Sequence, residues 1–160
     1  MTRQRILFVC TGNICRSPTA EGVARGLAQK RGMEELFEFD SAGTHGYHVG
    51  EPPDPRTVAA AAKRGYDLSL LRARRVTEFD FVCCDHVLAM GPDHLEWLRR
   101  ACPSPHRSKL GLFLDFSEDL ETDEVPDPYY GDGQGFEHVL DLVEDAAAQL
   151  ILKLAINRLE

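Results

Sequence analysis

The sequence predicts a single α/β domain, residues 1–160, built on a doubly wound four-stranded parallel sheet with helices on both faces. Four short apolar runs, each bounded by turn residues, indicate buried strands. Stretches with apolar residues at helical spacing separate these runs, and an alternation of strands and helices favours a parallel sheet. The links between them are short, and a length of 160 residues suits one domain with a full core.

The first half of the chain gives two strands and two helices. The run 5–9 predicts the first strand, and 36–43 predicts the second. Between them, Ser17 and Pro18 are suited to the N-cap and first position of a helix that ends near Gly32. Its predicted core stripe consists of Ala20, Val23, Ala24, Leu27 and Ala28.

A loop over 44–53 follows the second strand, and Asp54 with Pro55 begins a helix that we expect to run to Arg64. Residues 67–85 show no clear period, and the arginines at 72, 74 and 75 indicate a solvated face. The run 86–90 predicts the third strand, and Gly91 with Pro92 begins a helix that ends at 99–100.

The last quarter begins with a fourth predicted strand over 109–114. Residues 116–124 are polar and strongly acidic, which predicts an exposed, mobile segment. A long helix should then pack along the sheet through the stripe Phe136, Val139, Leu140, Val143, Ala147, Leu150, Ile151 and Leu154.

Composition excludes several classes of protein. The formal net charge of -8 argues against a nucleic-acid partner, which selects basic surfaces. No apolar run approaches the roughly 18 residues that a membrane span needs, so no membrane is expected. Five cysteines, an odd number, without a signal-peptide pattern predict a reducing, cytoplasmic location. None of their spacings suits zinc, and we expect neither a metal nor a cofactor.

The strand-to-helix turn over 10–17 carries the predicted chemistry. Gly12 and Asn13 tolerate left-handed backbone, so this loop can curl with its N–H groups pointing inward to form an anion nest at a helix N-terminus. Arg16 can close over the same anion with a planar two-pronged donor. Cys10 would then lie at the floor of a phosphate-sized cradle, where the surrounding dipoles favour the thiolate, a nucleophile.

The pattern Cys10-x5-Arg16-Ser17-Pro18 resembles the low molecular weight protein tyrosine phosphatase family, and the block 125–131, Val-Pro-Asp-Pro-Tyr-Tyr-Gly, is similar to that family's general-acid loop. The resemblance covers nearly the whole chain. It implies metal-independent hydrolysis of phosphotyrosine in proteins through a phosphocysteine. Cys10 would be the nucleophile, Arg16 the phosphate ligand and Asp127 the general acid. Without the resemblance, Asp127 between two prolines would be an ordinary turn residue.

The resemblance also implies the binding residues. Those of the phosphate loop are Thr11, Gly12, Asn13, Ile14, Cys15 and Ser17, and those around the substrate ring are Tyr47, Tyr129 and Tyr130. Without the resemblance, Tyr47 could equally be an exposed aromatic residue of a loop with no role in binding. Ser17 could donate to the Cys10 sulfur besides capping the helix. The implied partner is a tyrosine-phosphorylated protein, with a bacterial tyrosine kinase as one candidate.

The sequence departs from the family in three places that concern the rigidity of the loop. In the family, Asn13, Ser17, Ser41 and a histidine form a hydrogen-bond network, but the position of the histidine is Leu71 here. An aspartate after the third strand is replaced by Gly91, and a nearby asparagine by His94. The nucleophile, the arginine and the acid are unaffected.

Cys15 lies five residues from Cys10 in the same loop, which predicts that a disulfide between them could trap oxidised Cys10 reversibly. Simple packing of the loop is the other interpretation of Cys15.

Three alternative functions stay open. Thioredoxin-coupled arsenate reductases share the Cys-x5-Arg loop but need two spaced cysteines, whereas Cys83 and Cys84 are adjacent. Phosphoarginine phosphatases of the same family carry threonine where this chain has Ile14, an apolar residue suited to a phenyl ring. A phosphate-binding module without catalysis is the non-enzyme alternative.

Overall fold

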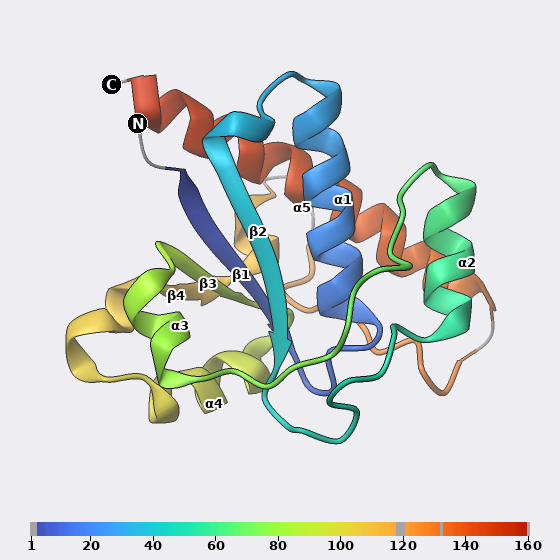
Figure 1. The fold of residues 1–160 in the computed structure, drawn as a ribbon, viewed down its shortest axis with the longest axis horizontal. Coiled ribbons are helices and arrows are strands. Elements are labelled where there is room, and N and C mark those ends of the chain that lie inside the picture. Colours follow the sequence, from blue (N-terminus) through green and yellow to red (C-terminus); the bar gives the residue numbers. More distant parts are fainter. Residues whose placement is uncertain (1–2, 118–120, 132, 160) are drawn as a thin grey trace.

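The computed structural model of the chain describes residues 3–117, 121–131 and 133–159. Four strands form one sheet in the order β2-β1-β3-β4, and every pair in it is parallel (Figure 1). The predicted four-stranded parallel sheet is therefore confirmed. Its strands are β1 (Gln4–Cys10), β2 (Phe37–Gly43), β3 (His86–Ala89) and β4 (Leu110–Leu112).

The central strand β1 is buried on both faces, as a parallel strand between two layers of helices must be. Ile6, Phe8 and Cys10 belong to the core on one side of the sheet, while Leu7 and Val9 belong to the core on the other. This alternation follows from the two-residue period of a strand. It explains why residues 6–9 of the first run include no polar side chain.

Helices cover both faces, which confirms the doubly wound arrangement (Figure 1). On one face lie α1 (Arg16–Lys30) and the long α5 (Gly133–Leu159), with α2 (Pro55–Lys63) packed against α5. On the other lie α3 (Glu78–Cys83) and α4 (Pro92–Ala101). The structure also contains the short 3-10 helices η1 (Glu34–Leu36), η2 (Ser104–Lys109) and η3 (Phe113–Phe116).

The structure corrects two boundaries. The fourth strand is shorter than the predicted 109–114, because Phe113 and Leu114 turn into η3 and bury their side chains there. The segment 67–85, expected to be irregular, contains the helix α3. A capping box between Thr77 and Asp80 begins this helix, and the same pair of residues in the sequence could have predicted it.

The arginines of this segment do not all lie on a solvated face. Arg72 and Arg75 are exposed as predicted. Arg74 is half-buried, and its guanidinium contacts the carboxylates of Asp40 and Asp80, each at 2.9 Å. The solvated-face interpretation is therefore wrong for Arg74, whose charge is neutralised by two elements, β2 and α3.

The segment predicted to be acidic and exposed is only partly described, since residues 118–120 lie outside the described ranges. Residues 121–124 are exposed as expected, and Val125 after them is fully buried. In α5 the predicted apolar stripe is buried from Phe136 to Leu154. Among the described residues, no helix combines the length and the apolar character needed to cross a membrane.

Candidate active site

Cys10 ends β1 at the carboxyl edge of the sheet, and a five-residue loop leads from it directly into α1. Its side chain is 2% exposed, and Sγ lies 3.0 Å from Ser17 Oγ. The helix begins one residue before Ser17, with Cys15 at the N-cap position and no side chain as cap. The prediction that Ser17 caps the helix is therefore wrong. Its hydroxyl faces the sulfur instead.

The loop curls through one left-handed residue, Asn13, with φ of 59°. Asparagine accepts this conformation at low cost, and Gly12, also expected to use it, does not. The Asn13 amide nitrogen donates to Ser17 Oγ at 2.8 Å and to Ser41 Oγ at 3.0 Å, and its oxygen accepts from the Arg74 backbone N–H at 3.0 Å. The turn is thereby fixed by bonds to α1, to β2 and to the segment that connects α2 with α3.

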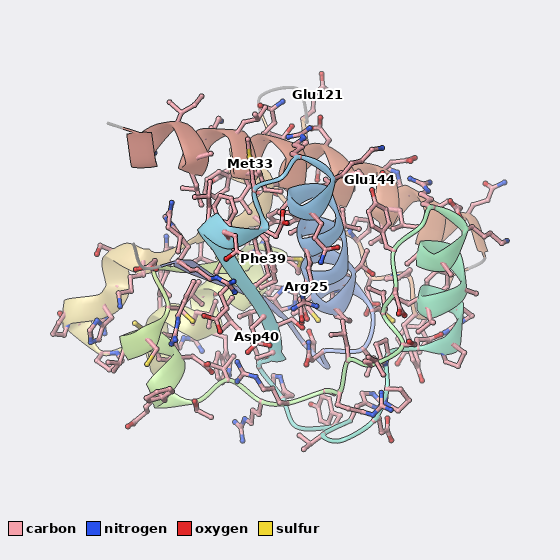
Figure 2. The ribbon with its side chains drawn as sticks, turned by 45° about the horizontal axis from the view of Figure 1, so that its top comes forward. Arg25, Met33, Phe39, Asp40, Glu121 and Glu144 are labelled. Carbon is pink, nitrogen blue, oxygen red and sulfur yellow. The ribbon has the colours of Figure 1, made fainter. Side chains whose placement is uncertain are left out.

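Behind this turn lies a buried carboxylate that the sequence did not single out. Ser41 Oγ donates to Glu21 Oε1 at 2.7 Å, and Arg25 contacts the other oxygen of Glu21 at 2.7 Å. Burial raises the pKa of Glu21, while the hydrogen bonds from Ser41 and Arg25 act to lower it. Figure 2 shows Arg25 extending from α1 toward β2, where it also donates to the Phe39 carbonyl at 3.0 Å. In the sequence, nothing distinguishes Glu21 from an ordinary surface position of an amphipathic helix.

The missing histidine of the network does not leave Asn13 without a partner. Leu71, at that position, packs against the apolar core. The Arg74 amide supplies the bond to the Asn13 oxygen. Gly43, at the end of β2, allows the phosphate loop to pass closely, because a Cβ there would lie 2.6 Å from the Thr11 carbonyl oxygen.

Arg16 lies over the loop with a guanidinium that is nearly fully buried. Its Nη1 lies 3.4 Å from the Val125 carbonyl oxygen, and its Nη2 lies 3.5 Å from Thr11 Oγ1. The same Nη2 is 3.7 Å from Asp127 Oδ2. The predicted nucleophile loop and the predicted acid loop, more than a hundred residues apart in the chain, therefore meet at this arginine.

A cavity of about 340 Å³ opens above Cys10. Ten of the twelve residues proposed from the sequence line it: Cys10, Thr11, Gly12, Ile14, Cys15, Arg16, Tyr47, Asp127, Tyr129 and Tyr130. The other two, Asn13 and Ser17, are buried behind the loop and support it. His48 also lines the cavity, and only its place in the loop next to Tyr47 could have pointed to it.

The rim of the cavity is aromatic, while its floor is polar. Tyr47 is 70% exposed and stacks on His45, with ring centres 5.1 Å apart. Across the opening, Tyr129 and Tyr130 pack edge to face at 4.9 Å. Aromatic walls around a positively charged floor suit an aryl phosphate.

The acid loop is anchored by Arg56, a residue that the sequence analysis did not propose. Arg56 Nη2 donates to the Tyr129 carbonyl at 3.0 Å, and its guanidinium lies 5.4 Å from the centre of the Tyr129 ring. The arginine is in turn held by Asp54, whose pKa it lowers through a hydrogen bond. Asp54 N also donates to the Ile14 carbonyl at 2.9 Å. The acid loop is thus tied to the phosphate loop through the start of α2. Within the acid loop, Tyr129 N donates to Asp127 Oδ1 at 3.0 Å.

Two of the departures from the family pattern, Gly91 and His94, lie at the start of α4 and contact segments that form the site. At Gly91 a Cβ would lie 3.0 Å from Glu124 Cγ, so the glycine leaves room for this side chain of the segment before the acid loop. His94 is buried, and its Nε2 lies 2.8 Å from Thr11 Oγ1.

Cys83 and Cys84 lie at the end of the sheet opposite to Cys10. Cys83 and Cys84 precede β3 at the amino edge of the sheet, where the Asp85 amide donates to the carbonyl of Arg5. Arg5 and Cys10 are five residue steps apart along the strand, a distance of about 16 Å. Burial raises the pKa of Cys84 to about 12. Within the described ranges no cluster of histidine, cysteine and carboxylate side chains could hold a metal ion.

Comparison with known proteins agrees with this geometry. The family model described as low molecular weight phosphotyrosine protein phosphatase matches residues 5–159. A low molecular weight protein-tyrosine-phosphatase of Streptomyces coelicolor is 44% identical over 92% of this chain and 91% of its own. A solved protein tyrosine phosphatase of Entamoeba histolytica, with Hepes in its active site, has a TM-score of 0.93 at 41% identity, over 97% of this chain and 99% of its own. Vibrio vulnificus Wzb, solved in complex with benzylphosphonate, has a TM-score of 0.82 at 28% identity, over 95% and 99%. The chain belongs to the low molecular weight protein tyrosine phosphatase family, and its activity is the hydrolysis of phosphotyrosine in proteins.

Proposed function

We propose that the reaction proceeds through a phosphocysteine formed on Cys10. The Cys10 thiolate attacks the phosphorus in line, the S–P bond forms, and the bond from phosphorus to the tyrosyl oxygen breaks. Asp127 gives its proton to that oxygen, so that tyrosine leaves neutral. In the second step Asp127, now a carboxylate, takes a proton from water as the water oxygen attacks phosphorus. Cys10 leaves as the thiolate, and inorganic phosphate is released.

The observation that carries this proposal is the placement of Cys10, Arg16 and Asp127 around one cavity. Phosphoryl transfer needs mainly positioning and stabilisation of charge. Arg16 and the backbone dipoles of the loop at the start of α1 supply positive charge at the cradle. Ser17 Oγ, 3.0 Å from the sulfur, can donate to the thiolate both before the attack and as it leaves.

The binding residues divide the substrate between them. The backbone from Thr11 to Cys15 surrounds the phosphoryl group, and Asn13 holds this loop in shape. Tyr47, Tyr129, Tyr130 and Ile14 would enclose the phenyl ring. Benzylphosphonate, the ligand in the Vibrio vulnificus Wzb structure, likewise joins a phenyl ring to a phosphonate.

We further propose that residues 1–160 act as one catalytic domain that uses no metal or cofactor, in a reducing cytoplasm that protects Cys10 from oxidation. The substrate would be a tyrosine-phosphorylated protein, and a bacterial tyrosine kinase is the candidate that we favour. The isolated kinase domain, phosphorylated on tyrosine, should lose phosphate when the enzyme is added. A phosphorylated kinase that resists dephosphorylation, while a phosphotyrosine peptide is hydrolysed, would contradict this choice of partner.

Substrate class is tested by hydrolysis of matched peptides that carry phosphotyrosine, phosphoserine or phosphoarginine, in buffer with EDTA. Phosphotyrosine should be hydrolysed at least about 100-fold faster than the others, because only its ring meets the aromatic rim and because a phenolate oxygen is a better leaving group than the alkoxide oxygen of serine. Faster hydrolysis of phosphoarginine would favour the other branch of the family. Reduction of arsenate in the presence of thioredoxin would favour a reductase, although Cys83 and Cys84 lie at the opposite edge of the sheet.

The nucleophile is tested by Cys10→Ser. This variant should lose turnover by more than about 10³-fold, since a hydroxyl at neutral pH is a far weaker nucleophile than a thiolate. It should still bind vanadate, because the cradle and Arg16 are intact. Acid quenching of the wild type during turnover should trap a phosphorylated Cys10 peptide. Substantial turnover by Cys10→Ser would refute the mechanism.

A further inference from the structure

A buried histidine contacts the phosphate loop from the side of the sheet opposite to α1. His94 lies in the first turn of α4, is 6% exposed, and places Nε2 2.8 Å from Thr11 Oγ1. Its other ring nitrogen, Nδ1, is buried and finds no hydrogen-bond partner among the described residues. Because buried polar atoms without a partner are rare, this atom restricts which tautomer of the ring is favourable.

The unpartnered nitrogen identifies the proton position. A neutral imidazole carries one N–H and one bare nitrogen. If Nδ1 carried the hydrogen, a buried donor would stay unsatisfied, which is costlier than a buried bare acceptor. The lower-cost tautomer therefore has its hydrogen on Nε2, which donates to Thr11 Oγ1.

The surroundings keep His94 neutral. Burial, followed by the charge of Arg16, lowers the pKa of His94 to about 4. The carboxylates of Asp93 and Asp127 act to raise this pKa, and His45 makes the smallest contribution, which lowers it. A doubly protonated ring would place a second cation beside Arg16.

This tautomer determines what the Thr11 hydroxyl can do. Its oxygen accepts from His94 Nε2 and also from Arg16 Nη2, at 3.5 Å. A hydroxyl has two lone pairs and one hydrogen, so with both lone pairs occupied the hydrogen stays available as a donor. Thr11 lines the cavity together with Cys10 and Arg16, where a phosphoryl oxygen would lie.

We propose that His94 is a positioning residue for phosphoryl binding: through its Nε2–H it holds the Thr11 hydroxyl as an acceptor for Arg16 and as a donor to a phosphoryl oxygen. The proposal rests on the proposed use of the Cys10 cradle as a phosphoryl site. Thr11 touches the substrate, whereas His94 acts only through Thr11. A family member with asparagine at this position would lack this particular contact, since the shorter amide does not reach as far as Nε2 of histidine.

The test compares four variants with the wild type: His94→Gln, His94→Leu, Thr11→Val and the double variant His94→Leu/Thr11→Val. The matched control is His138→Leu, the same change at an exposed histidine of α5 that does not line the cavity. Each protein is assayed for kcat and KM with p-nitrophenyl phosphate and for inhibition by vanadate. Unfolding curves in urea establish that each variant is folded.

Thr11→Val should lower kcat/KM and weaken vanadate binding by about 10- to 100-fold, since a bond to a charged acceptor is lost. His94→Leu should cost about 3- to 10-fold, and the double variant should be no worse than Thr11→Val alone, because His94 acts through the hydroxyl. His94→Gln places an amide N–H where Nε2–H stood and should recover most of the loss. His138→Leu should match the wild type.

Nitrogen-15 NMR of the ring supplies a readout that catalysis does not influence. The Nε2 resonance of His94 should be that of a protonated nitrogen and Nδ1 that of a bare one at pH 7. The reverse assignment, additive losses in the double variant, or equal activity of His94→Leu and the wild type would each overturn the proposal. Those outcomes concern His94 alone. A wild type that binds vanadate but does not hydrolyse aryl phosphates would instead contradict the proposed function.

Discussion

The buried His94 should make the folding stability of this protein depend on pH, independently of catalysis. Its pKa in the fold is lowered to about 4, from an ordinary value of 6.5, first by burial and then by the charge of Arg16. Between these two values the unfolded chain binds a proton at His94 that the folded chain does not. Stability must therefore fall as pH decreases from 6.5 toward 4, because the unfolded state then binds more protons.

The size of the effect follows from the gap between the two pKa values. A gap of this size corresponds to about 3 kcal/mol of unfolding free energy over the whole window, at about 1.4 kcal/mol per pH unit. Between pH 7 and pH 5 about 2 kcal/mol of this should be lost. Since domains are stable by only about 5–15 kcal/mol, such a loss is readily measured.

The assay is urea unfolding at pH 7, 6 and 5, followed by circular dichroism, for the wild type and His94→Gln. Glutamine does not titrate, so the variant should lose about 2 kcal/mol less than the wild type between pH 7 and pH 5. His138→Gln is the control, because His138 is an exposed histidine of α5. His86, whose pKa burial also lowers, is present in all three proteins and cancels. Parallel pH dependences for the wild type and His94→Gln would refute the reasoning.

Three further predictions concern the catalytic loops. Asp127→Ala should slow phenyl phosphate by about 10²–10⁴-fold but an activated aryl phosphate far less, because a good leaving group needs no proton; equal losses in steady-state assays would make Asp127 merely structural. In Arg56→Met the bond to the Tyr129 carbonyl is lost while Asp127 itself is present, so the loss of activity should depend on the leaving group in the same way but be about a tenth as large or less. Arg56→Lys should lose an intermediate amount of activity. A loss of activity that does not depend on the leaving group would contradict the role of Arg56 in anchoring the acid loop. Peroxide should inactivate the enzyme reversibly through a disulfide between Cys10 and Cys15, which peptide mapping should find, and Cys15→Ser should recover less activity on reduction. The disulfide should form slowly at pH 7, because burial raises the pKa of Cys15 to about 12 and little Cys15 thiolate is present to attack oxidised Cys10. Full recovery of Cys15→Ser would sink the last of these.

What could be predicted from the sequence is local in origin. The strand over residues 5–9 and the stripe of α5 are visible because burial repeats with the period of the element. The loop from Cys10 to Arg16 is contiguous, so the spacing of its residues already restricts where they can lie. Asp127 was identified only through its family's acid loop, and no property of its own segment could place it 3.7 Å from Arg16.

What the sequence could not supply are bonds between distant segments. Glu21 occupies a helix position that looks solvated, yet it is 4% exposed and accepts from Ser41 of β2. Arg56 has no signal of its own beyond an Asp-Pro-Arg helix start, and its importance appears only when Tyr129 is brought beside it. Ser17 was misassigned as the N-cap because a serine before a proline is the usual signal. In the structure the helix begins at Arg16, and the Ser17 hydroxyl lies 3.0 Å from the Cys10 sulfur instead.

The three departures from the family pattern redistribute the contacts that hold the site. Leu71 contributes packing to the core where the family has a histidine, and the oxygen of Asn13 is satisfied by a backbone amide, which no substitution at residue 74 other than proline removes. Gly91 leaves space for Glu124, so the segment entering the acid loop can lie close to the end of β3. His94 reaches Thr11, which in turn contacts Arg16. At the left-handed turn itself, both the amide nitrogen and the oxygen of the Asn13 side chain have hydrogen-bond partners without any contribution from residue 71.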